Sequence, residues 1–394
     1  MIKIMEALTL STHDTHSLPL HRNLNIGALA RLFSERATSY KYLFFISLID
    51  EIIQHPKNCY AHPLPLEHEP LSTNDYLRIN LTDIIISLLQ FGWYPHRFFK
   101  LNFGASDRVG KALDQLIFSI NEQTITHPNT IQSLRLAIHE QFQRIGAEQF
   151  KRFVPYRILT PFFAQQLKGI PDHQKNKRIV ELAAESFLTS DSAFYHFENN
   201  AQTLVIHPTW QEYFTVNYAI IRGWALLMWA RYLQARNPNV PSILDKIEPP
   251  AKRSSLSQQR LYWSNILCHS SLYCIYSGKR LNPKTFTLDH FLPWSFICHD
   301  ELWNLIPADP VANSAKGRAL PSDKNFCDFI VQQHEGLSIY KKIHGNNKSW
   351  NRVARTFVEG LSISENELLD YSKLLVAYEN KLNPLISLAR TMGY

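Results

Sequence analysis

Cysteine and charge are both scarce in this chain of 394 residues, and each scarcity excludes a class of protein. The five cysteines contain no C-x-x-C pair, which argues against a disulfide framework and against a four-cysteine zinc knuckle. Reduced thiols fit a reducing compartment, so we expect a cytoplasmic protein. Charged residues make up 19% of the chain without a long Lys or Arg tract, so the formal charge of +7 favours a polyanionic partner only mildly.

Segments that would enter or cross a membrane are missing as well. Residues 1–6 show no apolar run of the kind that a signal peptide has. The most apolar long stretch, residues 216–233, is interrupted by Arg222 and Arg231, and the eight residues between them are too few to span a bilayer. We therefore predict a buried helix in this stretch and a soluble protein.

A nucleotide-binding loop is absent too. Gly104 and Gly110 precede Lys111 in the manner of a phosphate-binding loop, but five residues separate the glycines where that motif has four. No Ser or Thr follows the lysine, so this segment carries no functional prediction.

Apolar and aromatic residues are plentiful. The hydrophobic content is 45%, with 23 Phe, 17 Tyr and 8 Trp, so two domains with large cores are expected. Prolines and polar residues between Asn237 and Ser255 predict a connector, with a helical domain over residues 1–250 and a second domain over residues 251–394. Helices are expected at residues 40–53, 73–92, 109–120, 130–142, 177–187, 210–234, 257–268 and 365–381, with a short extended segment at 203–206. The first of these helices, with Thr38 or Ser39 as its cap, is apolar around much of its circumference, so it should be central to its domain.

Residues 274–321 form the segment that carries chemistry. Residues 285–291 alternate and are rich in β-branched and aromatic side chains, which predicts a strand that Pro293 ends. A loop or second strand should follow up to Leu305, and residues 311–316 suit the start of a short helix. This order of elements would bring together four polar residues: Asp289, His290, Asn304 and Asn313.

An acid beside a histidine, followed by two asparagines and a lysine, suits the cleavage of a phosphodiester. Such a bond resists water because its negative charge repels a nucleophile. Cleavage needs a base that activates water and a cation that neutralises the developing charge. This segment contains residues for both tasks.

The pattern resembles the HNH nuclease family, with its ββα-metal fold, in the variant whose last motif residue is Asn. HNH domains of the RNA-guided CRISPR nucleases have the same spacings from Asp-His to the two asparagines and the lysine. Residues 273–279 also resemble the Cys-x-Tyr-x-Gly-Lys opening of that domain. The likeness covers about residues 273–321. It implies a ββα-metal core. Together with the helices expected elsewhere, the chain should be mainly α with a small α+β module: an N-terminal helical domain, then this core flanked by C-terminal helices.

The resemblance also implies a role for each motif residue. His290 would be the general base that deprotonates the attacking water. Asp289 and Asn313 would be oxygen ligands of one Mg²⁺ or Mn²⁺. Asn304 would orient the loop and, through it, the His290 ring. Phosphate contacts are expected from Lys316, Lys279 and Arg318.

One departure from the family concerns the scaffold. Many members hold the fold with two zinc-binding C-x-x-C knuckles, which this chain lacks. Packing must then hold the domain together, and Phe291, Trp294, Trp303 and Leu305 are candidates for that core.

The implied activity is metal-dependent hydrolysis of phosphodiester bonds in DNA. The aromatic-rich helices of residues 1–250 are similar to those of bacterial HNH proteins of antiphage defence systems, and we expect this domain to recognise substrate or to dock a partner such as a regulatory ATPase. Two alternatives stay open. The HNH module could be the scaffold of a non-catalytic nucleic-acid- or protein-binding component, or the substrate could be RNA, although nothing in the sequence points to contacts with a 2′-OH.

Overall fold

The computed structural model describes residues 18–34, 38–55, 76–119, 128–189, 192–248 and 255–394. These residues are mostly helical and contain two small antiparallel sheets, which agrees with the expected fold class. The chain divides into two compact units, Met1–Pro238 with Ile247–Pro249, and Asn239–Lys246 with Pro250–Tyr394. The segment Asn239–Lys246 precedes the expected boundary at residue 250 and nevertheless packs with the second unit.

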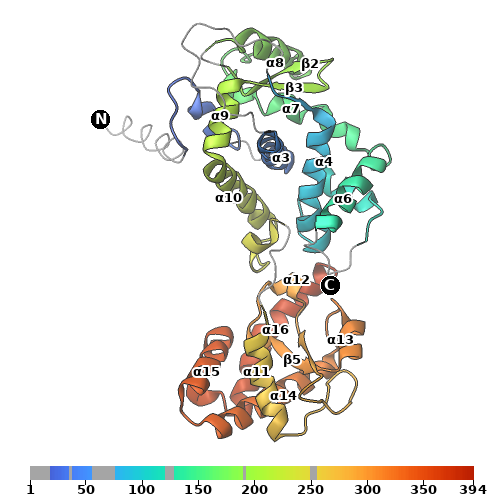
Figure 1. Ribbon diagram of the computed structural model, residues 1–394, viewed down its shortest axis with the longest axis vertical. Helices are drawn as coiled ribbons and strands as arrows, with labels where there is room; N and C mark the ends of the chain where they lie inside the picture. The colour runs from blue at the N-terminus through green and yellow to red at the C-terminus, as the bar shows by residue number, and fades with distance from the viewer. Residues whose placement is uncertain (1–17, 35–37, 56–75, 120–127, 190–191, 249–254) are drawn as a thin grey trace, which may run out of the picture. The chain divides into compact units, whose positions relative to one another are not determined.

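Helix α3 (Tyr40–Gln54) forms the centre of the first unit, as its apolar circumference predicted. It lies between α4 (Leu81–Trp93) and α10 (Tyr218–Arg236) (Figure 1). Ser39 was an expected cap of this helix, but its side chain makes no capping bond. Its backbone N–H donates instead to Asp107 Oδ2 at 3.0 Å, because that buried carboxylate needs donors.

The remaining elements of the first unit differ from expectation in several ways. The helix expected at 109–120 ends at Gln115, and the helix expected at 177–187 already begins at Asp172. The expected helix at 210–234 is broken at Asn217, whose amide donates to the Tyr213 carbonyl at 3.0 Å and so ends the first half. The extended segment at 203–206 belongs to a three-stranded sheet of order β1-β3-β2, whose two outer strands were not predicted. The elements are β1 (Arg78–Asn80), β2 (Tyr195–Glu198), β3 (Thr203–Ile206), α2 (Ile26–Ala30), α5 (Arg108–Gln115), α6 (Pro128–Glu140), α7 (Val154–Arg157), α8 (Asp172–Ser186) and α9 (Pro208–Val216).

Two further points concern the start of the helix expected at 73–92 and the membrane. The start of the helix expected at 73–92 lies outside the described residues, and the described part begins with β1 and enters the helix only at Leu81. Among the described residues, no helix is both long and apolar enough to cross a membrane.

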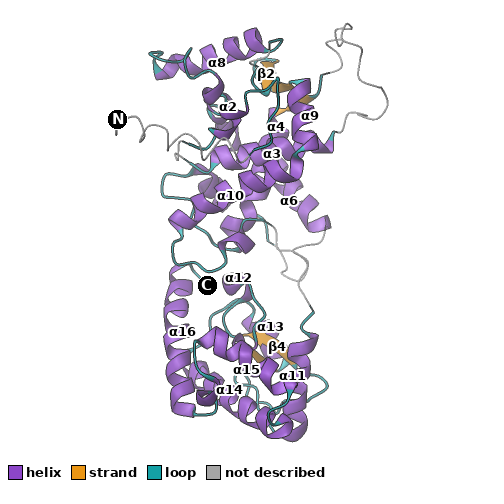
Figure 2. Cartoon of the chain, turned by 90° about the vertical axis from the view of Figure 1, so that its left-hand side faces the viewer, coloured by secondary structure: helices purple, strands orange, loops and turns teal. Residues whose placement is uncertain are grey.

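The second unit places a two-stranded sheet among helices (Figure 2). The sheet consists of β4 (Thr287–His290) and β5 (Leu305–Ala308), and α13 (Pro310–Lys316) packs on β4. The helix expected at 365–381 begins later, because residues Glu365–Glu367 form a separate 3-10 turn. The other elements are α11 (Ser257–His269), α12 (Trp294–Ile297), a 3-10 turn at Leu302–Asn304, α14 (Asp323–His344), α15 (Lys348–Leu361) and α16 (Tyr371–Thr391).

Aromatic packing holds this sheet in place. Phe291 stacks on Phe329 of α14 with ring centroids 4.0 Å apart. Trp303 is buried, and its carbonyl accepts the Tyr378 hydroxyl of α16 at 3.1 Å. Leu305 is fully buried, whereas Trp294 is only half-buried. Burial of each large apolar side chain contributes about 1.5–3 kcal/mol, so a few such residues can stabilise a module of this size.

Two helical glycines, one in each unit, are expected to respond in opposite ways to an added methyl group. Gly360 of α15 lies against the Trp303 indole, and a Cβ at Gly360 would overlap the ring. We expect Gly360→Ala to lower the free energy of unfolding of the second unit by about 1–3 kcal/mol, although Ala is the better helix former. Gly223→Ala in α10, where no atom lies within 4 Å of the added carbon, should stabilise the first unit by roughly 0.5–1 kcal/mol. Denaturant unfolding measures both, and an unchanged Gly360→Ala variant would contradict this packing.

Candidate active site

The register of the two strands sets the site. Asp289 lies opposite Ile306, and His290, the last residue of β4, lies opposite Leu305. The chain leaves β5 directly into α13, whose first turn is fixed by Asp309: its carboxylate accepts the Ala312 N–H at 3.2 Å. The strand that carries Asp-His and the short helix are therefore held against each other.

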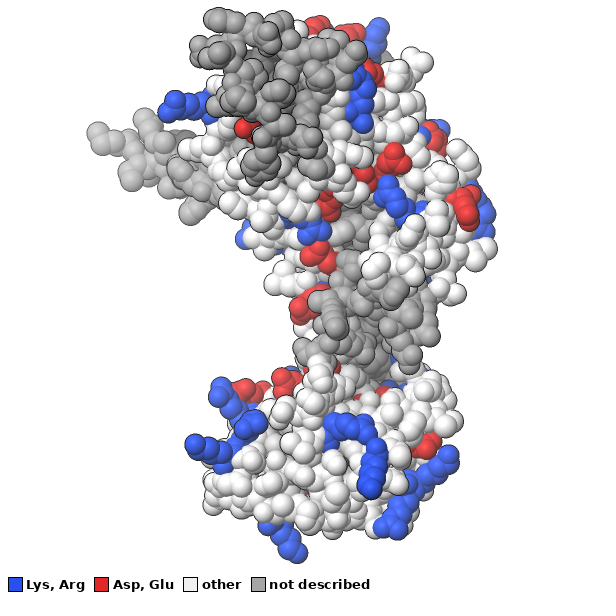
Figure 3. Space-filling view, viewed as in Figure 1, with Lys and Arg blue, Asp and Glu red and all other residues white. Residues whose placement is uncertain are grey.

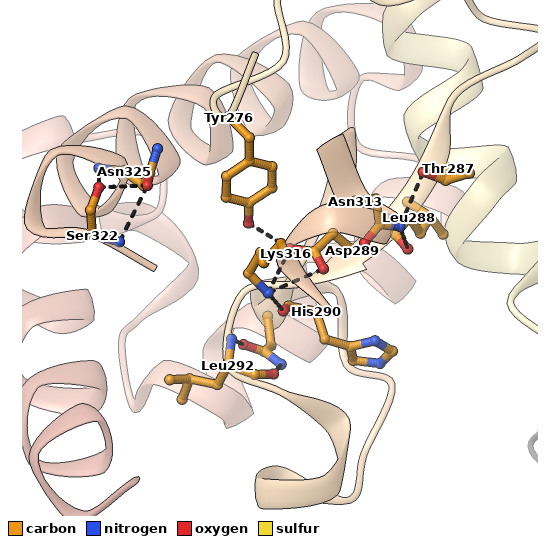
Figure 4. Close-up of polar contacts among 11 residues, drawn as sticks. Tyr276, Thr287, Leu288, Asp289, His290, Leu292, Asn313, Lys316, Ser322 and Asn325 are labelled. Atoms are coloured by element: carbon orange, nitrogen blue, oxygen red, sulfur yellow. Dashed lines mark hydrogen bonds and ion pairs between the residues drawn. The ribbon is translucent and has the colours of Figure 1, made fainter. Parts of the chain in front are cut away.

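Two residues of α13 reach β4 from one face of the helix, since they are three positions apart. Asn313 Nδ2 donates to Thr287 Oγ1 at 3.1 Å and to the Leu288 carbonyl at 3.3 Å. Lys316 Nζ lies 3.2 Å from Asp289 Oδ1, 3.1 Å from Asp289 Oδ2 and 2.9 Å from the His290 carbonyl (Figure 4). The two α13 residues named by sequence reasoning thus meet the strand of Asp289.

Asp289 is a buried carboxylate, with 4% of its surface exposed. Besides Lys316, it accepts the Tyr276 hydroxyl at 2.5 Å on Oδ2. Burial and the neighbouring Asp289 raise the pKa of Tyr276 well above its ordinary value, so the phenol stays protonated and keeps donating. An ionised carboxylate at this depth requires such partners.

The atoms around the Lys316 ammonium indicate what this place can hold. Both carboxylate oxygens of Asp289 and the His290 carbonyl surround a positive charge, and these are the hard oxygen donors that Mg²⁺ prefers. The amide nitrogen of Asn313 is hydrogen-bonded to β4, which leaves its Oδ1 as a further oxygen ligand for a metal ion. The residues therefore fit a divalent ion in place of the ammonium. The described part of the chain contains no cluster of three or more His, Cys, Asp or Glu suited to a metal.

The imidazole of His290 does not join this cluster. Figure 4 shows the ring pointing away from Lys316, and only the backbone carbonyl of His290 contacts the ammonium. Successive side chains of a strand face opposite sides, which separates the ring from the Asp289 carboxylate. The ring Nε2 lies 2.8 Å from Asp300 Oδ1, in the loop between α12 and the turn at Leu302–Asn304. The convergence of all four side chains expected from the sequence is thus only partial.

Asn304 lies elsewhere again, fully buried behind the strand end. Its Oδ1 accepts the Leu292 N–H at 2.9 Å, and its Nδ2 donates to the Leu292 carbonyl at 3.0 Å. Its own carbonyl accepts the Phe291 N–H at 2.8 Å. Both ends of the amide hold the backbone that follows His290, and neither is available to a metal.

Residues 274–322 match the family model for the HNH endonuclease. The chain contains an HNH endonuclease domain. The match covers all of the site residues above, from Tyr276 to Lys316, and confirms the resemblance to the HNH family. No curated protein and no solved structure matches the chain. HNH nucleases act on nucleic acids and generally use divalent metal ions, so the domain indicates a nuclease of this general kind.

The other two expected phosphate-contacting residues, Lys279 and Arg318, lie at the two ends of α13. Lys279 is largely exposed and its Nζ lies 3.5 Å from Asp309 Oδ2, the carboxylate that caps α13. Arg318 is half-buried and follows Gly317, which ends α13 with φ 51°. Both therefore lie beside the helix whose Asn313 and Lys316 contact β4.

Sequence reasoning missed two contributors to the HNH domain's site. Tyr276 was part of the recognised opening, but nothing in its spacing showed that its hydroxyl reaches Asp289. Asp300 carried no signal at all, because its contact with His290 depends on the path of the loop that contains α12.

Removal of the Asn304 amide should loosen the strand end. Asn304→Ala leaves the N–H and carbonyl of Leu292 buried without these partners, so we expect a loss of about 2–4 kcal/mol in the free energy of unfolding of the second unit. Denaturant unfolding followed by tryptophan fluorescence measures this loss. Asn282→Ala is a matched control, since that amide is exposed and bonds only within its own turn. Equal stabilities of the two variants would contradict the assigned role.

Proposed function

We propose that this protein is a metal-dependent HNH endonuclease that hydrolyses phosphodiester bonds in DNA. The observation that supports it best is the buried cation site at the end of β4, where Asp289 and the His290 carbonyl hold the Lys316 ammonium. A histidine lies next to these oxygens in sequence, and its ring nitrogen contacts a carboxylate. A cation site and an adjacent base are the two requirements for cutting this bond.

In this proposal Asp289 and Asn313 hold one Mg²⁺ or Mn²⁺. The bound ion would neutralise charge on the scissile phosphate and on the leaving oxygen. His290 takes the proton of the attacking water, and Asn304 keeps the strand end in the conformation that presents the ring. Because Asp289 and His290 are consecutive, a phosphodiester lying across the end of β4 would meet both.

Charge in the second unit favours a polyanionic substrate. Residues 250–394 contain 17 Lys and Arg against 12 Asp and Glu. In Figure 3 the basic side chains outnumber the acidic ones on the visible face of this unit. Lys279 and Arg318 flank the cluster formed by α13 and β4, where they would contact backbone phosphates, and Lys316 would do so once it leaves Asp289.

The first unit is assigned the control of this activity. An unrestrained nuclease would damage its own host's DNA, which favours a unit that recognises substrate or docks a regulatory partner such as an ATPase. We propose on this ground that the protein is the nuclease effector of a bacterial antiphage defence system. A purified chain that cuts plasmid at full rate and captures no companion would contradict this assignment.

Plasmid cleavage tests the activity itself. With Mg²⁺ or Mn²⁺ the full chain should nick supercoiled plasmid, and chelator should stop it. His290→Ala should lower the rate by about 10²–10⁴-fold, because water then lacks its base. His344→Ala is a control, since that histidine lies at the end of α14 against Tyr340, away from β4. Near-normal cutting by His290→Ala would refute the role of this residue. No cutting with either ion, with or without added partners, would favour the non-catalytic binding role.

Lys316 and a divalent ion need the same Asp289 oxygens, so they should compete. Lys316→Met removes a charge-assisted bond worth about 1.5 kcal/mol and should tighten Mn²⁺ binding by roughly tenfold. The same variant should cut more slowly, because the lysine is also needed at phosphate. Lys279→Met is the matched control and should leave Mn²⁺ affinity unchanged. Titration followed by Mn²⁺ electron paramagnetic resonance measures affinity without any turnover, and an unchanged or weaker affinity in Lys316→Met would rule out competition.

A further inference from the structure

One carboxylate of the HNH domain contacts the proposed base and has no role in the function described so far. Asp300 Oδ1 lies 2.8 Å from His290 Nε2. The two side chains are 21% and 11% exposed, so water reaches this pair only in part. A surface ion pair contributes little to stability. A carboxylate hydrogen-bonded to a partly buried imidazole, in contrast, decides which ring nitrogen carries the proton.

The backbone around Asp300 is held from several elements. Gln259 of α11 donates to the Asp300 carbonyl at 3.0 Å. Before Asp300, the chain leaves α12 through Cys298, whose left-handed backbone ends that helix. The buried Lys246 ammonium donates to the Phe296 carbonyl at 2.6 Å and so fixes α12 itself. A loop with these anchors can hold a carboxylate in one place.

The chemistry of the pair selects one form of the ring. A neutral imidazole has one N–H donor and one acceptor nitrogen, whereas an ionised carboxylate only accepts. The proton must therefore be on Nε2, which faces Asp300, and the lone pair must be on Nδ1. In the described part of the chain, Nδ1 of His290 makes no hydrogen bond. The nitrogen that can accept a proton is thus not occupied by a protein partner.

The other titratable groups near the His290 ring do not accept its Nε2 proton in place of Asp300. Burial, followed by the nearby His290, lowers the pKa of His299 to about 4, so this neighbour is neutral at pH 7. Its Nδ1 already accepts the Glu301 N–H at 3.3 Å. Lys246 and Lys381 also lie close enough to affect His299, and both are cations that cannot accept a proton from His290 Nε2.

We infer that Asp300 is a positioning residue, which orients the His290 ring and fixes its Nε2–H tautomer so that Nδ1 can accept the proton of the attacking water. The inference rests on the proposed function, in which His290 is the general base. It adds to that function a carboxylate–histidine pair that neither the motif nor the family match assigns. Asp300 stabilises the positive charge that forms on the ring, and it does not itself take the proton.

Single-turnover nicking at saturating Mg²⁺ and DNA tests the kinetic part. Asp300→Asn should lower the cutting rate by about 10–100-fold with little change in DNA affinity, and Asp300→Glu should restore part of the rate. Glu301→Gln is the matched control, because this neighbouring carboxylate is exposed and should not affect the rate. In a His290→Ala background, Asp300→Asn should have no further effect, since it acts through the ring. An equal further loss in that background would show a merely structural role and overturn the inference.

Nitrogen NMR of ¹⁵N-histidine-labelled full-length protein tests the tautomer without any cutting. The His290 signals, assigned by their loss in His290→Ala, should show a protonated Nε2 and an unprotonated Nδ1. Asp300→Asn should shift that balance while Glu301→Gln leaves it unchanged. Wild-type cutting together with a His290 tautomer that ignores Asp300→Asn would overturn this inference and spare the proposed function. No cutting by the wild type with an Asp300-dependent tautomer would contradict the proposed function and leave the pairing intact.

Discussion

A carboxylate removed from water needs positive charge beside it, and the arrangement of the HNH domain follows from this need at Asp289. Desolvation of such an ion costs several kcal/mol, so its oxygens must be matched by donors in fixed places. Here the donors come from two directions, the Tyr276 hydroxyl and the Lys316 ammonium. Lys316 can reach Asp289 only because α13 packs on β4, and α13 begins where it does because Asp309 caps it directly after β5.

The end of β4 presents a cation with its oxygen ligands on one side and the His290 imidazole on the other. On one side, Asp289 and the backbone carbonyl of His290 surround a cation. The imidazole of His290 points away from that cation (Figure 4). Its Nε2 contacts Asp300. The two groups lie on opposite sides of the strand although they belong to adjacent residues. Asn304 does not enter either cluster, yet it fixes the backbone on which both depend.

Much of this could be predicted from sequence where the physical signal is local. Alternation over residues 285–291 located β4, and residues 311–316 were expected to start the short helix that brings Asn313 to that strand. Contacts that depend on the path of a loop could not be predicted from the sequence. The contact of Asp300 with His290 follows from a loop that is shaped by α12 and held by Gln259, and no pattern of residue types encodes that path. The direction of the His290 ring follows from strand alternation and could have been anticipated, but the motif's compact spacing suggested full convergence.

In the first unit, the prediction succeeded for the central helix and failed for a helix break and two strands. The apolar circumference of α3 predicted its central place correctly, because a helix that is buried on all sides needs apolar residues on all sides. The break at Asn217 was missed, since the apolar pattern continues across it and only one side-chain bond to Tyr213 ends the first helix. Strands β1 and β2, three and four residues long, were not predicted.

Crystals of the full chain grown with Mn²⁺ and a short DNA duplex, measured at the manganese absorption edge, would test whether the oxygens now around Lys316 hold a catalytic divalent ion. We expect one anomalous peak bonded to Asp289 oxygen, with Asn313 Oδ1 nearby and Lys316 moved from Asp289 to a DNA phosphate. An Asp289–Lys316 pair that stays intact while DNA is bound, with manganese absent or bound elsewhere, would contradict it.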